Sequence, residues 1–183
     1  ECDGRRYRPK TSRFRIRPEN PRVWTPENPH LYTVVVRNCD DAVETYFALR
    51  TIEPKKVGKH HRLCLNGKPY FFHGMLDQGY WPDGLFLPGS PEGYTWDVKT
   101  MKSLGFNTLR KHIKIEPERF YYDCDRLGMI VFQDLVNSGP YHYLRDTAIP
   151  TIGGKLATYH EAPSERRRNF FLIHGEETLR HLY

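Results

Sequence analysis

The sequence predicts an α/β fold with a parallel sheet, preceded by part of an all-β domain. Three segments share one order of features: an apolar run, a turn, an amphipathic helix, and a glycine or loop before the next element. Such alternation is typical of βαβ units, whose strands pair in parallel. Ligands of parallel sheets bind beyond the carboxyl ends of the strands, so functional side chains are expected at that edge.

The all-β part is expected in residues 1–56. Phe14 and Ile16 alternate with arginines, and the runs Leu31–Val36 and Val43–Leu49 are rich in β-branched and aromatic residues. Proline-rich turns separate these runs. An immunoglobulin-like sandwich needs roughly 100 residues and about seven strands, so residues 1–56 are expected to be the carboxyl-terminal part of such a domain.

A basic stretch, Pro54–His61, lacks apolar periodicity and is expected to be a linker to a second domain at 57–183. Two apolar runs follow, Leu63–Leu65 and Tyr70–Phe72, with Asn66-Gly67 between them. Asn-Gly between apolar runs is the strongest short signal for a hairpin, because both residues tolerate the positive φ of a type I′ turn.

The remaining elements form three strand–helix units. The predicted strands are Tyr70–Gly74, Phe106–Arg110 and Met129–Asp134, and the predicted helices are Tyr94–Leu104, Pro117–Leu127 and Ser164–Tyr183. Thr95 and Ser164 are available as amino-terminal caps, and Gly128 is available to end the second helix. The third helix has an apolar side that includes Phe171, Leu172, Leu179 and Leu182. A (β/α)8 barrel needs about 200 residues or more, so we expect a partial TIM barrel of about three βα units.

The composition fits a globular protein, with 38% hydrophobic and 14% aromatic residues. A formal net charge of +6 raises the possibility of nucleic-acid binding, but the basic residues are scattered and no nucleic-acid motif accompanies them. The four cysteines form no CxxC pair, which argues against a structural zinc site and leaves disulfides open. No apolar stretch reaches the roughly 20 residues of a membrane span, and the compartment stays open.

Two connections after strands are much longer than usual and carry candidate binding residues. They are residues 75–93, with Asp77 and Trp81, and residues 136–163, with Asn137. Aromatic rings beside carboxylates, amides and histidines suit sugar rings, which present apolar C–H faces and a rim of hydroxyls. The alternative is that these aromatic side chains pack the loops onto the sheet.

Polar side chains at the strand ends are the other candidates: Asp77, Arg110, His112, Gln133 and Asp134. An arginine there can lower the pKa of a facing carboxylate by one to three units. The alternative for Arg110 is a structural ion pair. Glu116, beside Pro117, is interpreted as a charge at a helix start rather than a catalyst. The expected binding residues are therefore Asp77, Trp81, Arg110, His112, Asp134 and Asn137, with no metal ligands and no cofactor.

Four strings in one order resemble glycoside hydrolase family 2, which includes β-galactosidases, β-glucuronidases and β-mannosidases. They are PRVWTPENPHLY, LCLNGKPYFFHGMLDQGYW, DVKTMKSLGFNTLRKH and EPERFYYDCDRLGMIVFQD. The resemblance covers nearly the whole chain. It implies the end of an immunoglobulin-like domain followed by the start of a catalytic TIM barrel.

The same resemblance suggests roles for two residues and shows three departures. Asn107 and Arg110 match an Asn-x-x-Arg segment whose arginine contacts the catalytic nucleophile. The family's Ser-His-Tyr-Pro after this arginine is replaced by residues 111–114, Lys-His-Ile-Lys, and its Asp-Glu at the third strand end by Gln133-Asp134. Asp77 stands where relatives carry a basic residue.

Both catalytic glutamates of the family are expected beyond Tyr183. The resemblance thus implies a retaining exo-β-glycosidase as the parent enzyme, and a chain that lacks turnover by itself. Its partner would be a β-glycoside, with neither nucleic acid nor membrane. The alternative is a non-catalytic carbohydrate-binding or interaction module. An open sheet edge would also favour self-association.

Overall fold

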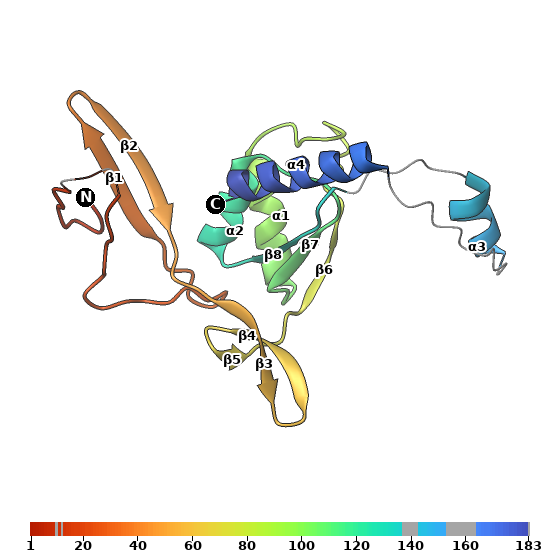
Figure 1. Cartoon of the computed structure of the whole chain (residues 1–183), viewed down its shortest axis with the longest axis horizontal. Coiled ribbons are helices and arrows are strands. Elements are labelled where there is room, and N and C mark those ends of the chain that lie inside the picture. Colours follow the sequence, from red (N-terminus) through yellow and green to blue (C-terminus); the bar gives the residue numbers. More distant parts are fainter. Residues whose placement is uncertain (10, 12, 137–142, 153–163, 183) are drawn as a thin grey trace.

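The computed structural model describes residues 1–9, 11, 13–136, 143–152 and 164–182, and all structural statements concern these. The described chain contains three small sheets and several helices (Figure 1). The strands are β1 (Tyr32–Asn38), β2 (Asp41–Phe47), β3 (Ile52–Val57), β4 (His60–Leu65), β5 (Lys68–Pro69), β6 (Gly74–Asp77), β7 (Thr108–Lys111) and β8 (Ile130–Gln133). The helices are α1 (Glu92–Ser103), α2 (Glu118–Leu127), a π-helical turn (Leu144–Ala148), α3 (Ile149–Thr151) and α4 (Glu165–Leu182). None of the described helices combines the length and apolar character needed to cross a membrane.

The strands β1 and β2 form an antiparallel hairpin that extends away from the parallel sheet (Figure 1). Tyr32 pairs with Phe47, and their rings stack with centroids 4.9 Å apart. Both strands were predicted from their β-branched and aromatic content. The strand expected around Phe14 and Ile16 does not form, and Phe14 is 52% exposed. Alternation alone makes no strand where no neighbouring segment supplies the hydrogen-bond ladder.

The expected linker is instead a strand pair. β3 and β4 pair antiparallel, with Lys55 opposite Arg62, and β5 continues the sheet. Pro54 is tolerated because β3 lies at the edge of this sheet. The turn at Asn66 and Gly67 has positive φ at both residues, as predicted for a type I′ hairpin. The domain boundary between residues 56 and 57 stays a prediction.

The three-stranded parallel sheet was predicted, and its order is β6-β7-β8. Its first strand begins four residues later than predicted, at Gly74, so Phe72 precedes the sheet rather than belonging to it. A Cβ atom on Gly74 would lie 2.5 Å from the Thr108 carbonyl oxygen, so only glycine permits this close pairing. The run before Gly74 was mistaken for a strand because it is apolar and aromatic. Its residues Tyr70 and Phe72 instead pack in a separate cluster around Trp24.

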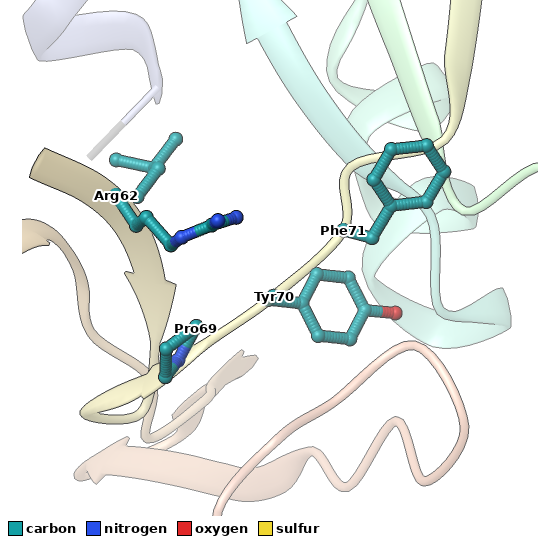
Figure 2. A pocket seen from close by; sticks show the side chains of 5 residues that line it. Arg62, Pro69, Tyr70 and Phe71 are labelled. Atoms are coloured by element: carbon teal, nitrogen blue, oxygen red, sulfur yellow. The ribbon is translucent and has the colours of Figure 1, made fainter. Parts of the chain in front are cut away.

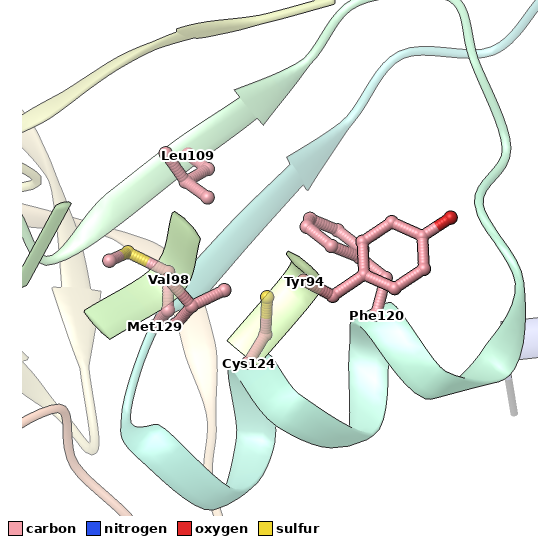
Figure 3. Packing of buried hydrophobic residues seen from close by; sticks show 6 residues of the cluster. All are labelled: Tyr94, Val98, Leu109, Phe120, Cys124 and Met129. Atoms are coloured by element: carbon pink, nitrogen blue, oxygen red, sulfur yellow. The ribbon is translucent and has the colours of Figure 1, made fainter. Parts of the chain in front are cut away.

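Helices α1 and α2 cover one face of the parallel sheet and enclose its main core (Figure 3). This core consists of Tyr94, Val98, Leu109, Phe120, Cys124 and Met129. As predicted, α2 ends at Gly128, whose φ is 80°. Cys124 of the same helix is a buried thiol, and burial raises its pKa. Thr95 is not a cap: α1 begins at Glu92, and the Thr95 hydroxyl donates to Asp123 Oδ2 at 2.6 Å.

Helix α4 packs through small residues rather than through its large apolar ones. Gly175 and Thr178 are buried, whereas Phe171, Leu172 and Leu179 are exposed. A Cβ on Gly175 would lie 3.8 Å from Leu135, in the segment after β8, and the helix contacts α2. The prediction that Phe171, Leu172 and Leu179 form the contact side of this helix is therefore wrong for the described chain. On the exposed side of α4, Glu176 and Arg180 form an ion pair one turn apart, at 2.6 Å.

A second cluster joins all three sheets around Trp24, which is fully buried. Its ring packs with Leu65 of β4 and Ile130 of β8, and its indole Nε1 donates to the Asp125 carbonyl oxygen of α2 at 2.7 Å. The Asp125 carboxylate accepts from Arg50 at 2.6 Å and from the hydroxyl of Tyr46, on β2, at 3.1 Å. The Arg50 guanidinium lies 4.7 Å from the centre of the Trp24 ring.

Replacing Trp24 by Phe should lower the free energy of unfolding by about 2–3 kcal/mol, because the change leaves a cavity and an unpaired carbonyl. The matched control is Trp96→Phe, since Trp96 is 65% exposed. Its effect should stay within about 0.5 kcal/mol. Urea unfolding followed by circular dichroism measures both, and equal effects would contradict the central role of Trp24.

Candidate functional site

The carboxyl ends of β6, β7 and β8 present polar side chains on both faces of the parallel sheet. Neighbouring positions across the sheet are Leu76, Arg110 and Phe132, followed by Asp77, Lys111 and Gln133. Because successive side chains on a strand alternate in direction, Arg110 and Lys111 point to opposite faces. Lys111 is 1% exposed under the helices, whereas the side chain of Arg110 is 59% exposed.

On the open face, Arg110 forms a two-point ion pair with Asp134. Its Nε and Nη2 atoms donate to the two carboxylate oxygens, each at 3.0 Å. These hydrogen bonds lower the pKa of Asp134 and raise the pKa of Arg110. The structure thus brings together the arginine and the carboxylate that the sequence placed at adjacent strand ends.

His112 and Gln78 lie beside this pair. His112 contributes to the lowered pKa of Asp134, and its Nδ1 lies 3.4 Å from the Gln78 amide nitrogen. Gln78 follows β6 and His112 follows β7, so three successive strands each supply a polar group to this edge. The arrangement offers donors and acceptors for hydroxyl groups, with a fixed negative charge at Asp134.

Asp77 lies on the helix-covered face, apart from that group. Its carboxylate accepts from Lys111 Nζ at 2.8 Å and from the Gly79 amide at 2.8 Å. It also lines a cavity of about 400 Å³ between β6 and α1, together with Tyr80 and Asp97. Burial raises the pKa of Asp97, and the charge of Asp77 adds to the effect. Asp97 was missed in the sequence, although an acid between Tyr94, Val98 and Met101 breaks the apolar side of α1.

A buried network of charged side chains lies beneath the loop between β7 and α2. It was not predicted from the sequence. Glu116 Oε1 lies 2.6 Å from Lys111 Nζ and 2.9 Å from Lys114 Nζ, and its side chain is 0% exposed. Tyr94 donates to its other oxygen at 3.2 Å. Glu116 lies just before α2, as expected of a charge at a helix start, but its carboxylate is buried and paired with two lysines. With Asp77, the network contains two carboxylates and two ammonium groups, so its charges balance.

The loop carries local backbone strain at Ile113, whose φ is 45°. A β-branched residue in this region is a genuine outlier, and such a conformation costs about 1–3 kcal/mol. It reverses the chain between Lys111 and Lys114, so that both ammonium groups reach Glu116. The same short loop holds His112 beside the Arg110–Asp134 pair.

The aromatic candidate Trp81 packs against the main core. Its ring lies edge-on to Tyr94 at 5.7 Å and is half-buried. This is the packing alternative considered for the loop aromatics, and a substrate contact for Trp81 stays a prediction. Asn137 lies outside the described residues.

The sequence of this chain is similar to those of known glycoside hydrolases. The family model described as Glycosyl hydrolases family 2 matches residues 5–50. A β-galactosidase of Pseudoalteromonas haloplanktis is 28% identical over 82% of this chain and 15% of its own length. A putative β-glucuronidase of Formosa agariphila is 27% identical over 63% of this chain and 11% of its own length.

Solved structures show a related fold. A β-glucuronidase from Parabacteroides merdae superposes with a TM-score of 0.56 at 23% identity, covering 72% of this chain and 17% of that one. A glycosyl hydrolase family 2 member from Bacteroides cellulosilyticus gives 0.56 at 24% identity, covering 67% and 16%. At these identities the likeness concerns the fold alone. The chain spans less than a fifth of each of these proteins.

Glu116→Gln should lower the free energy of unfolding by about 3–5 kcal/mol, because it removes the negative partner of two buried ammonium groups. Glu118→Gln is the matched control, since that side chain is 85% exposed. The control should change stability by no more than about 0.5 kcal/mol. Chemical denaturation at neutral pH measures both, and a neutral effect of Glu116→Gln would show that the network carries no net stabilisation.

Arg110→Gln should raise the pKa of Asp134 toward that of an ordinary aspartate, about 3.9. Arg110 depresses this pKa in the folded protein. The pair therefore stabilises the fold at pH values above the ordinary pKa of an aspartate. That stabilisation is lost as the pH falls through the depressed pKa. Side-chain carboxyl ¹³C NMR follows the titration directly. Arg126→Gln is the control, because Arg126 pairs with Asp123 instead; an unchanged Asp134 titration in Arg110→Gln would refute the coupling.

Proposed function

Since the chain belongs to glycoside hydrolase family 2, we propose that it contributes the sugar-binding start of a retaining exo-β-glycosidase. In this proposal residues 1–56 end an immunoglobulin-like domain, and residues 57–183 begin a (β/α)8 barrel. The parallel order β6-β7-β8 with helices between the strands supports the barrel. The substrate would be a β-glycoside, since relatives carry the names β-galactosidase and putative β-glucuronidase.

The Arg110–Asp134 pair is the observation that carries the proposal. The pair lies at the strand ends where barrel enzymes bind substrate. Its exposed guanidinium can donate to sugar hydroxyls or to a carboxylate, while Asp134 accepts hydrogen bonds from hydroxyls. Four side chains would position the sugar ring: Arg110, Asp134, His112 and Gln78. Asp77 would contribute from the other face of the sheet, where its carboxylate accepts a hydrogen bond from Lys111.

The described carboxylates at these strand ends are poorly suited to be the catalytic pair. Retaining glycosidases use one carboxylate as nucleophile and another as acid/base, with the acid held protonated. The lowered pKa of Asp134 keeps it ionised, and Asp77 is paired with Lys111. We therefore assign them to binding, and the two catalytic glutamates to residues outside this chain.

The purified 183-residue chain should bind galactose or glucuronate at this edge without hydrolysing nitrophenyl β-glycosides. NMR titration should shift the ring signals of His112, and Arg110→Gln should reduce the affinity by about tenfold, a typical effect of losing a charge-assisted hydrogen bond. Release of nitrophenol above the buffer rate should not occur.

Two results would separate the alternatives. Hydrolysis that is lost in Arg110→Gln would contradict the absence of turnover. Unchanged His112 signals with both sugars would instead favour an interaction module over a substrate site. Arg126→Gln, which changes the same charge on α2, should leave sugar binding unaltered.

Self-association through the edges of the parallel sheet is a further part of the proposal. In the described chain β6 and β8 are the outer strands, so each offers unpaired backbone groups. Multi-angle light scattering should report species larger than 21.7 kDa, with a mass that rises with concentration. A constant monomeric mass would count against it.

A further inference from the structure

A second hollow lies away from the carboxyl ends of the parallel strands. It has a volume of about 420 Å³ and is lined by Arg62, Leu63, Pro69, Tyr70 and Phe71. Tyr70 and Phe71 precede β6, so the hollow lies toward the amino end of that strand, next to the β3–β4–β5 sheet. Its volume falls within the range of small-ligand sites, about 300–1,000 Å³.

Arg62 supplies a free cation to this hollow. Figure 2 shows its side chain extending from β4 toward the segment that carries Tyr70 and Phe71. Within the described part of the chain, no carboxylate forms an ion pair with this guanidinium. Its neighbour across the ladder, Lys55, is paired with Glu53 at 2.9 Å.

Aromatic rings form the opposite side. Phe71 is 79% exposed, so its ring is accessible to a ligand. Its ring stacks on His73 at 5.8 Å, and Asn107 Nδ2 donates to its carbonyl oxygen at 2.9 Å. Tyr70 is fixed by a 2.6 Å hydrogen bond to Glu27. The bond to Glu27 pre-orders the Tyr70 ring, and the Asn107 bond fixes the backbone of Phe71, which reduces the entropic cost of binding.

The local charge is mostly positive. Residues 52–65 contain Lys55, Lys56, Lys59 and Arg62 but only one acid, Glu53, and the Glu27 carboxylate nearby is occupied by the hydroxyl of Tyr70. A guanidinium fork matches a carboxylate in two-point geometry, and an aromatic face matches the apolar face of a sugar ring. From this combination we propose that the hollow, here called the Arg62 site, binds a carboxylate-bearing sugar. This inference does not depend on the role assigned to Arg110.

NMR titration of the 183-residue chain tests this directly, with ¹³C-labelled phenylalanine and the Phe71 signal assigned through Phe71→Leu. The probes are glucuronate, trigalacturonate and, as the neutral control, glucose. Both acidic probes should shift the Phe71 signal, and glucose should shift it at least about fivefold more weakly. A response to trigalacturonate alone would also support the site and would identify its ligand as a segment of an acidic polymer.

Matched variants decide whether Arg62 is responsible. Arg62→Gln should weaken binding of the acidic probes by about fivefold or more, within the range for a charge-assisted hydrogen bond. Lys59→Gln removes the same charge from the same hairpin outside the hollow and should change affinity less than twofold. Arg110→Gln should leave the Phe71 response intact, which separates this site from the strand-end site.

Three outcomes would overturn the proposal. Equal loss in Arg62→Gln and Lys59→Gln, with comparable binding of a short oligonucleotide, would indicate diffuse attraction of polyanions. Equal binding of glucose would remove the need for a carboxylate. An unmoved Phe71 signal with both acidic probes would show that the hollow is not a sugar site.

Discussion

Two adjacent cations on β7 organise the functional end of the parallel sheet, because strand geometry sends them to opposite faces. Arg110 holds Asp134 on the open face, and Lys111 holds Asp77 and Glu116 beneath the helices. The first pair is solvent-accessible and available to a ligand. The second is enclosed and fixes the strand that carries both. One strand thereby couples a charge-balanced interior to an exposed, charged edge.

The buried network explains how an unfavourable loop conformation persists. Glu116 attracts Lys111 and Lys114 in the buried interior, where charge interactions are strong but isolated charges are costly. Because each charge has a partner, the network can offset the strain at Ile113. His112 sits inside the loop that this balance holds, so its position beside Asp134 depends on residues that never reach the surface.

Local signals in the sequence predicted the elements whose structure depends on local chemistry. The Asn66-Gly67 turn, the end of α2 at Gly128 and the parallel order of three strands follow from turn residues and alternation. The errors had two causes. Phe72 looked like part of a strand but packs near Trp24, some fifty residues earlier in the chain. Pro54 lies in an edge strand that pairs with the very next strand, so this hairpin was taken for a linker because of its proline and basic residues rather than because of a distant contact.

The candidate site shows the same division. Arg110 and Asp134 could be placed together because parallel strand ends converge, and their ion pair follows from that geometry alone. The environment of Glu116 could not be foreseen, because its burial depends on Tyr94 of α1 and on the inward direction of Lys111 and Lys114. A glutamate that follows two lysines and precedes a proline carries no sign of its burial.

The amino ends of the same strands are constrained in a different way, which clarifies why chemistry gathers at the other edge. Trp24 ties β8, α2 and the β4 strand together through a full hydrophobic contact and one indole hydrogen bond. A substitution at Trp24 would therefore lose packing contacts with several elements at once. At the carboxyl ends, by contrast, Arg110 and its neighbours remain open to solvent. Two segments in which the sequence departs from the family pattern, residues 111–114 and Gln133–Asp134, lie at this edge. Lys111 and Lys114 of the first segment nevertheless reach inward to Glu116, so part of this loop belongs to the buried core.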